Sequence, residues 1–490
     1  MTITESLDTP PGGEVERDRS TATTGRSGRL DLGVFVGLSM ALVGFGFGAS
    51  RISDNSFLTH LATGREMLDH GVVRSDVFTW TSGGDGVVVQ SWLASFVYAL
   101  VDDLAGFHGL RILTAVLAAL LAAMAWRLTA ASPSLLTRVA IMVPFLVVGH
   151  VSWTERPLLI AFVLFAVVVL IVEGSGRPRW LLVVGALWVN VHGSWPLALV
   201  YLAARGLGGT LDRDDVRVEF RAFAHLGVGL LVGGIVNPYG PAMLLFPLDL
   251  LGRQDVLSHV VEWQSPAFDS LWTRAFLVLV LGAVGALTRC GRWRDALPTM
   301  VFVAAALVGR RNIALAGIVL LPVLAHGLPT IGRLTARRTS DAVRFGCVAV
   351  ALMLVAVPIV AIEGPHVDVD RYPEDAITAM EEDLGLAPGE TRIIHQDFVG
   401  NYLDVRYGDA GATWIDDRFE LHDASLVEDY LVLLDGGPGW NDVLERYGAE
   451  AIVWPRDRVL VELATETGGW SEVWRDDDWV VLCAPGHPAC

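Results

Sequence analysis

Long apolar runs separated by short polar turns make up most of the chain between residues 31 and 362. The first run, residues 31–50, has the length of about 20 residues that one crossing of a bilayer needs. The pattern as a whole predicts an α-helical polytopic membrane protein with about eleven transmembrane helices. The further runs lie at residues 109–131, 139–150, 157–173, 180–193, 195–210, 222–236, 272–288, 296–309, 312–331 and 343–362.

A polar segment, residues 51–108, interrupts this pattern after the first run. Within residues 57–69 the apolar side chains recur on one side of a helix, which predicts an amphipathic helix lying on the membrane surface. The stretch SWLASFVYALV, residues 91–101, predicts a second short helix, either of the same kind or dipping into the membrane. We therefore expect this segment to form an outer loop that covers the bundle. The apolar side chains of the first helix are Leu58, Leu61, Ala62 and Leu68.

The pattern changes to that of a soluble α/β domain from about residue 363, where short strand-like and helix-like segments alternate. Residues 415–418 (IDDR) end one predicted strand, a place where α/β sheets hold ligands, although the sequence favours a capped loop on an acidic surface. Strands are predicted at residues 391–396, 412–417, 450–455 and 479–484, and helices near residues 373–385, 423–435, 439–447 and 457–467.

The chain is therefore expected to have three regions. Residues 1–30 are rich in Thr, Gly, Ser and charge, which predicts a disordered cytoplasmic tail. Residues 31–362 form the transmembrane domain, and residues 363–490 form an extracytoplasmic acidic α/β domain.

Composition and charge support this division. Only 18% of the residues are charged and 52% are hydrophobic, whereas soluble domains carry about 25% charged residues, so lipid must solvate most of the chain. From Glu363 onward, 29 acidic residues and 8 arginines give a net charge of −21, while the rest of the chain carries +3 of the total −18. This lack of clustered positive charge in the acidic domain argues against nucleic acid as a partner, and none is expected.

The arginines indicate the orientation of the chain. They are frequent before the first run. Along the later runs, they are frequent in alternate connecting turns and scarce in the turns between those. Because positive residues concentrate on the cytoplasmic side, we predict a multi-pass protein of the cell membrane with a cytoplasmic N-terminus and an extracytoplasmic C-terminal domain. The predicted inner arginines include Arg127, Arg138, Arg177, Arg205, Arg217, Arg292 and Arg337.

Polar residues suited to chemistry concentrate in the short turns of the predicted outer face. These turns are SWTERP (152–157), NVHGSW (190–195), NPYG (237–240), HVVEWQSP (259–266) and GRRN (309–312). An ionisable group at membrane depth costs about 2.5–3.5 kcal/mol and usually marks function. The candidate site residues are Asp54, Glu155, Arg156, Asn190, His192, Glu262, Arg310 and Arg311.

Several of these candidates also have a purely structural interpretation. Asp54 suits the cap of the helix that follows it, and Arg156 before a proline suits a membrane anchor at a helix start. His192 before a glycine suits a kink, and the side chains of Arg310 and Arg311 suit contact with lipid headgroups. Their concentration on one face favours a shared site.

Several motifs resemble the GT-C superfamily of membrane glycosyltransferases, in particular bacterial relatives of the mannosyl- and arabinosyltransferases that use polyprenyl-phosphate sugars. The resemblance starts with an acidic residue after the first crossing, followed by HLATGREML (60–68) and by SWLASFVYAL and GLRILTAVLAAL (91–120). TERPLL, NVHGSW, NPYG and RRN resemble the outer turns of that bacterial branch. GNYL and WIDDRFELHD, within residues 400–423, are similar to its outer domain.

The resemblance implies a hexosyl- or pentosyltransferase that moves a sugar from a polyprenyl-phosphate carrier to a cell-envelope glycan, lipid or protein at the outer face of the membrane. A carboxylate at the membrane exit can accept the acceptor's proton, and Asp54 is the candidate for this general base. Arg156, Arg310 and Arg311 are candidates for holding the lipid phosphate. Glu155, Asn190, His192 and Glu262 are the candidates for binding sugar or acceptor.

The sequence leaves two points open: whether a metal is used, and whether the protein has a different function. Relatives carry two adjacent acids that suit a divalent metal, whereas this chain has Asp54-Asn55, which weakens the case for a metal, and no other cofactor is indicated. A transporter or flippase, or a non-catalytic membrane protein of cell-envelope assembly that retains the fold, are the alternative functions. The absence of internal repeats disfavours the transporter.

Overall fold

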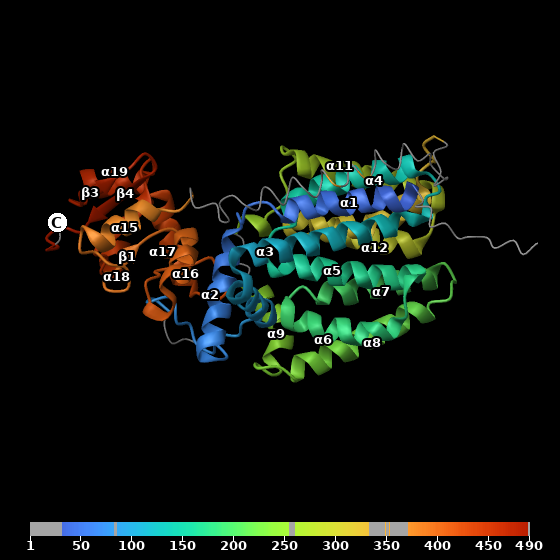
Figure 1. The fold of residues 1–490 in the computed structure, drawn as a ribbon, viewed down its shortest axis with the longest axis horizontal. Coiled ribbons are helices and arrows are strands. Elements are labelled where there is room, and N and C mark those ends of the chain that lie inside the picture. Colours follow the sequence, from blue (N-terminus) through green and yellow to red (C-terminus); the bar gives the residue numbers. More distant parts are fainter. Residues whose placement is uncertain are drawn as a thin grey trace, which may run out of the picture.

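The computed structural model describes residues 32–82, 86–253, 260–332, 348, 352 and 371–488. These residues fold mostly into helices, with a small sheet near the C-terminus. Figure 1 shows a bundle of helices lying side by side, with the C-terminal domain at one end and α2 (Asn55–His70) between the two. The predicted tail, residues 1–30, and nearly all of the predicted last crossing, residues 343–362, lie outside the described residues.

Length and apolar composition explain why the bundle forms. Five helical segments of the described chain are long and apolar enough to cross a membrane. Large apolar side chains on the outside of the bundle, such as Phe220 and Leu281, are exposed, which suits contact with lipid. The structure is thus consistent with a membrane protein, while eleven crossings and their orientation stay predictions. The five segments are Trp92–Ala131, Leu135–Ser152, Pro157–Gly174, Arg217–Ile235 and Leu271–Cys290.

Shorter helices complete the bundle around α13 (Ile313–Gly327), which is buried at every position except His326. Pro157 and Pro196 stand at the first turns of α5 and α7, where a helix has no need of the missing N–H group. The bundle helices are α1 (Leu32–Gly48), α3 (Trp92–Leu128), α4 (Leu135–Ser152), α5 (Pro157–Leu170), α6 (Leu181–Val191), α7 (Pro196–Leu211), α8 (Arg217–Ile235), α9 (Ala242–Leu251), α11 (Leu271–Cys290), α12 (Trp293–Val308) and α13.

The predicted outer loop forms a layer at one end of the bundle. α3 bends at Gly106, where φ is 59° and ψ is −161°, a conformation that glycine adopts without strain. The part of α3 before the bend packs on α2, and the rings of Phe57 and Tyr98 meet there at 5.3 Å. The helix predicted over residues 57–69 is confirmed. Its apolar face, however, contacts α3 and α16 (Asp397–Tyr407), and Leu68 is exposed.

The C-terminal domain contains a four-stranded sheet of order β1-β2-β4-β3, in which β1 and β2 are parallel and the other pairs antiparallel. Apolar cores cover both faces of the sheet. The domain consists of α15 (Glu374–Glu382), β1 (Ile393–Ile394), α16, α17 (Ala424–Asp435), α18 (Trp440–Tyr447), β2 (Ala451–Pro455), α19 (Val459–Glu466), β3 (Ser471–Arg475) and β4 (Trp479–Cys483).

Most of the predicted elements of this domain are confirmed, but the strand predicted at residues 412–417 is wrong. This segment makes only an isolated bridge, between Thr413 and Thr79. Side chains take the place of a neighbouring strand, because Trp414 N–H donates to His395 Nε2 at 2.9 Å and Asp417 N–H donates to the side chain of Asn401. The helix α16 and the strand β3 were not predicted.

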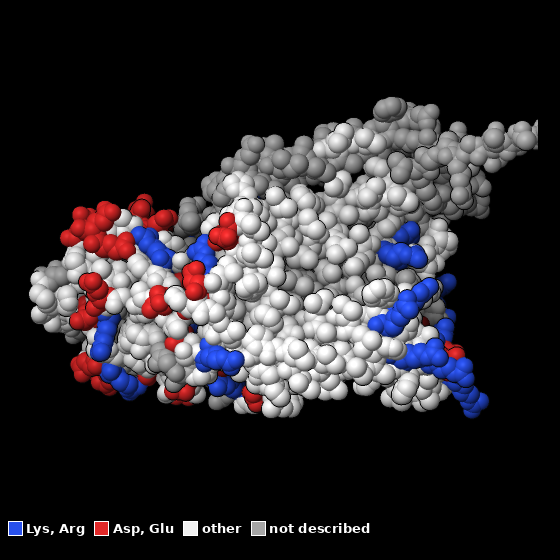
Figure 2. Space-filling view, turned by 60° about the horizontal axis from the view of Figure 1, so that its bottom comes forward, with Lys and Arg blue, Asp and Glu red and all other residues white. Residues whose placement is uncertain are grey.

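Charge differs between the two ends of the molecule (Figure 2). Arginine side chains gather at the bundle end remote from the C-terminal domain, whereas acidic side chains are frequent on that domain. Arg217 begins α8 at the arginine-rich end, and Arg292 directly precedes α12. This separation agrees in sense with the predicted orientation, in which the arginine-rich end faces the cytoplasm.

Candidate functional site

Asp54 lies between α1 and α2 and caps α2. Its backbone is extended, with φ −82° and ψ 120°, and its Oδ1 accepts a hydrogen bond from Ser56 N–H at 3.1 Å. The side chain is only 8% exposed. The capping role proposed from the sequence is therefore present, and it uses a small part of the hydrogen-bonding capacity of this carboxylate.

Arg156 links Asp54 to Glu262. It lies in the turn between α4 and α5, and its Nε contacts Oδ1 and Oδ2 of Asp54 at 2.6 and 2.7 Å. One of its terminal nitrogens donates to Oε1 of Glu262, which comes from the short helix η4 (Val261–Trp263). Burial lowers the pKa of Arg156, but the charges of Asp54 and Glu262 outweigh burial and raise it above the ordinary value. Three predicted residues from distant parts of the chain thus form one ion-pair chain.

Glu155, next to Arg156, forms no ion pair within the described residues. It is 5% exposed, and its Oε2 has no hydrogen-bond partner among the described residues. Burial raises its pKa to about 8, so the carboxyl is largely protonated at neutral pH. Glu155 is also not among the described residues that line the cavity defined below.

His192 and Asn190 stand at the end of α6 but have different surroundings. His192 Nδ1 accepts from Ser194 N–H at 3.1 Å, and burial together with the charge of Arg311 lowers the pKa of His192 to about 3, which keeps the ring neutral. Asn190 accepts from Trp92 Nε1 at 2.8 Å and donates to the backbone of Ala186 and Gly233. Asn190 therefore holds α3, α6 and α8 together.

The two arginines of the GRRN turn form the short helix η5 (Arg310–Asn312). The Arg310 guanidinium lies 5.4 Å from the ring centre of Trp272, and that of Arg311 lies 4.2 Å from the ring centre of Trp263. Burial lowers the pKa of Arg311, and among the described residues this arginine forms no ion pair. The charges of Glu262 and Glu420 act on Arg311 in the opposite direction to burial, but neither carboxylate forms an ion pair with it, so this buried cation can still pair with an anion.

A cavity of about 700 Å³, here called the interdomain cavity, lies between the bundle end and the C-terminal domain. Arg156, His192, Glu262 and Arg311 line it, so four of the predicted residues share one space. Asp54 is not among the lining residues, but its neighbours Asn55 and Ser56 and its ion-pair partner Arg156 are. Other lining residues are Thr59, His60, Thr63, Gln90, Trp263, Arg371, Gln396, Asp397, Asp417, Arg418, Glu420, Tyr430 and Arg458.

The C-terminal side of the cavity contributes the IDDR loop. Arg418 pairs with Asp416 and reaches Asp76 Oδ1 at 3.0 Å, and His422 Nε2 lies 3.1 Å from Asp416, so the loop is fixed to the outer layer. Asp417 faces the other way: its Oδ2 accepts from Ser56 Oγ and, at 3.4 Å, from Asn55 Nδ2. The sequence marked this loop as a candidate, but it did not predict the contact with α2.

His60 is a cavity residue that the sequence analysis missed. It lies on α2, and its Nδ1 is 3.2 Å from Ser95 Oγ of α3. Burial and the charge of Arg156 lower the pKa of His60 to about 4, so it is neutral at physiological pH. Its spacing in the sequence could have indicated it: His60 follows Ser56 by one helical turn, so the two lie on the same face of α2.

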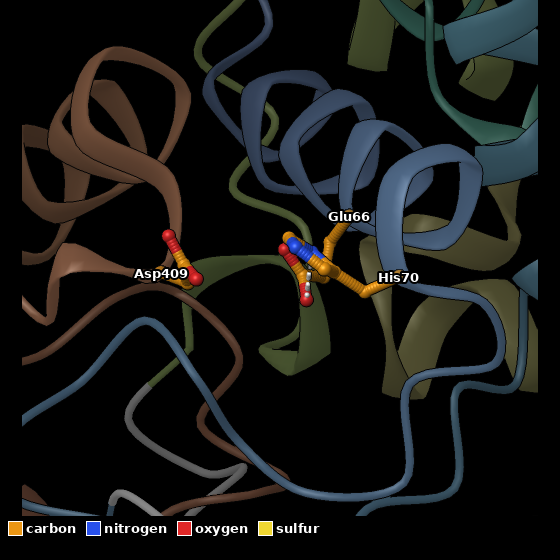
Figure 3. Close-up of side chains that lie close together, drawn as sticks. All are labelled: Glu66, His70 and Asp409. Atoms are coloured by element: carbon orange, nitrogen blue, oxygen red, sulfur yellow. Dashed lines mark ion pairs between the residues drawn. The ribbon is translucent and has the colours of Figure 1, made fainter.

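The described residues offer one group suited to a metal ion, and it lies outside the interdomain cavity. Glu66, His70 and Asp409 place their ligand atoms within 4.8 Å of one another (Figure 3). Since Asp54 precedes α2 and His70 ends it, this group is about 24 Å from Asp54 along the helix. At Asp54 itself the guanidinium of Arg156 contacts both carboxylate oxygens, so the residues present do not fit a metal there.

No protein-family model matches this chain, and no curated protein is similar to it at a significant level.

Proposed function

We propose that this protein is a membrane glycosyltransferase of GT-C type, which transfers a sugar from a polyprenyl-phosphate carrier to a cell-envelope acceptor inside the interdomain cavity. The observation that carries the proposal is Arg311, a buried arginine that lines this cavity and forms no ion pair among the described residues. Arg156, which pairs with Asp54 and Glu262, lines the same cavity. A phosphate group would give Arg311 the ion pair that it lacks.

The position of the cavity suits a donor with a lipid tail. The bundle exposes apolar side chains along its outside, and the cavity lies at the end of the same bundle. A polyprenyl chain in the bilayer can therefore run beside the helices while its phosphate meets arginine at the bundle end. Arginine is suited to this role because its planar fork binds phosphate oxygens in pairs.

The same geometry argues against the transporter alternative. Transporters bind substrates near the midplane of the bilayer, at breaks within helices. In this chain the buried ionisable groups of the cavity lie at one end of the bundle and beneath a separate domain. A non-catalytic protein, by contrast, has no need of a desolvated, unpaired arginine, which costs stability without a ligand.

The test compares Arg311 with its neighbour Arg310, which is absent from the described cavity wall. Full-length protein in nanodiscs is titrated with undecaprenyl phosphate, and binding is followed by tryptophan fluorescence, to which Trp263 next to Arg311 contributes. Arg311→Gln should weaken binding about 10- to 100-fold, since a hydrogen bond to a charged group contributes about 1.5–3 kcal/mol. Arg310→Gln should bind like wild type. Equal effects of the two variants, or no binding by wild type, would contradict the proposal.

A further inference from the structure

We propose that Asp417, from the C-terminal domain, is the carboxylate that accepts the proton of the attacking hydroxyl, and that Asp54 positions Arg156. This inference rests on the proposed function and names the general base of that reaction. It replaces the expectation from the sequence, which gave that role to Asp54.

The contacts of the acidic residues around the cavity distinguish Asp417 from the others. Arg156 takes both oxygens of Asp54 and also binds Glu262, and Asp397 accepts from the Tyr430 hydroxyl at 2.9 Å. A carboxylate held by arginine is stabilised in its charged form and is a weak proton acceptor.

Asp417, by contrast, forms no ion pair within the described residues. Its hydrogen bonds with Ser56 and Asn55 both use Oδ2, and Oδ1 has no partner in the described part of the chain. Glu420 also lines the cavity and forms no ion pair within the described residues, but a backbone hydrogen bond and the charge of Arg418 act on it, and its own charge acts on Arg311, the residue proposed to hold phosphate.

Asp417 is held next to Asp54 by residues of α2 and α16. Ser56 contacts both carboxylates, because its N–H donates to Asp54 and its hydroxyl donates to Asp417. Asn401 of α16 donates to Asn55 O at 3.1 Å and accepts from Asp417 N–H at 3.0 Å. The carboxylate of Asp417, from a separate domain, is therefore fixed against the N-terminus of α2, where the charge of Arg156 acts on it.

The electrostatic surroundings suit proton transfer at neutral pH. Burial raises the pKa of Asp417 to about 7, and this effect outweighs the hydrogen bond from Ser56 and the charge of Arg156, which act in the opposite direction. The charges of Asp416 and Asp397 raise the pKa further. A general base is most effective when its pKa lies near the working pH.

The acceptor hydroxyl loses its proton to Asp417 as its oxygen forms a bond to the anomeric carbon of the sugar. The bond from that carbon to the phosphate oxygen breaks, and its electron pair leaves with the polyprenyl phosphate. Asp417 then returns the proton to water.

The test uses full-length protein in proteoliposomes that contain a labelled polyprenyl-phosphate sugar. Mannosyl, glucosyl and arabinosyl forms are tried, and the form that wild type turns over is kept, with water as the acceptor when no other is present. Transfer is measured from pH 5 to pH 9, and binding of undecaprenyl phosphate is measured separately. The variants are Asp417→Asn, Ser56→Ala, Asp54→Asn and Glu420→Gln, with the fully exposed Asp477→Asn as control.

Wild-type transfer should rise with pH through a midpoint near 7, where the carboxylate of Asp417 loses its proton. Asp417→Asn should lower transfer about 10²- to 10⁴-fold and abolish this rise, while undecaprenyl phosphate still binds. Ser56→Ala removes a hydrogen bond that favours the ionised carboxylate, so the midpoint should move up by about 0.5–1 pH unit. Asp54→Asn should keep the rise, and Asp477→Asn should match wild type.

The outcomes separate the two proposals. Wild type that neither binds undecaprenyl phosphate nor transfers sugar overturns the proposed function. If wild type is active, loss of the rise in Asp54→Asn or Glu420→Gln, with the rise kept in Asp417→Asn, overturns only the inference. Should Asp417→Asn fail to fold, an unchanged midpoint in Ser56→Ala overturns the inference by itself.

Discussion

Replacing Arg156 by glutamine tests whether the ion-pair chain stabilises the end of the bundle. Arg156→Gln removes the contacts of 2.6 and 2.7 Å to Asp54, whose side chain is 8% exposed and keeps only the hydrogen bond from Ser56 N–H. Leaving a fully buried charge unpaired costs about 3–5 kcal/mol. Since Arg156 is 27% exposed, water recovers part of this loss, and we expect unfolding to become easier by about 2–3 kcal/mol.

The arm to Glu262 should contribute much less. Glu262 is 39% exposed, and exposed ion pairs contribute about 0.2–1 kcal/mol, so Glu262→Gln serves as the matched control. The free energy of unfolding is measured by titrating purified protein in mixed micelles with SDS and following tryptophan fluorescence. Wild type, Arg156→Gln, Asp54→Asn and the double variant complete a double-mutant cycle.

The cycle gives the decisive comparison. Because either single substitution breaks the same pair, the double variant should be destabilised by about 1–2 kcal/mol less than the sum of the single variants. Asparagine caps a helix about as well as aspartate, so loss of the cap does not confuse this comparison. Additive losses, with no coupling between the two positions, would refute the view that this pair stabilises the fold.

Gly64→Ala should destabilise the protein by about 1–3 kcal/mol in the same titration, because its Cβ would lie 2.0 Å from Ser95 O, whereas Gly227→Ala, which meets nothing within 4 Å, should be neutral or stabilising. Asn190→Ala should lower stability by about 1–3 kcal/mol but leave undecaprenyl phosphate binding unchanged, since its bonds go to Trp92 and to helix backbone. Folding raises the pKa of Glu155 from 4.5 to about 8, so its contribution to stability is complete below pH 4.5 and is lost as pH rises through 8. Glu155→Gln should therefore lose less thermal stability than wild type between pH 6 and pH 9.

The sequence predicted the helices better than it predicted the site. Long apolar runs fix the bundle helices because lipid and packing both require apolar faces, and α2 was recognisable from its spacing. Residues 412–417 have the composition of a strand, but the side chains of His395 and Asn401 satisfy their backbone from outside any sheet. Such long-range side-chain contacts leave no periodic signal in the sequence.

For the site, residue type and position at helix ends indicated Asp54, Arg156, His192, Glu262 and Arg311, which the structure brings to one region. Their division of roles depended on partners that the sequence does not specify. Asn190 lies at the end of α6, as His192 does, but its side-chain amide donates to the backbone of two helices. Whether these residues act on a donor stays a prediction, which the binding experiments test.

The contacts of α2 with the IDDR loop and with α16 affect when the cavity can form during synthesis. Ser56 and Asp417 are 361 positions apart in the sequence, and Asn55 and Asn401 are 346 apart. A ribosome makes α2 early and this loop late, while domains generally fold in the order of synthesis. Every bundle helix of the described chain is therefore made before the cavity can close. A chain that ends between residues 312 and 416 has Arg156 and Arg311 but lacks Asp417 and the later residues of the cavity wall.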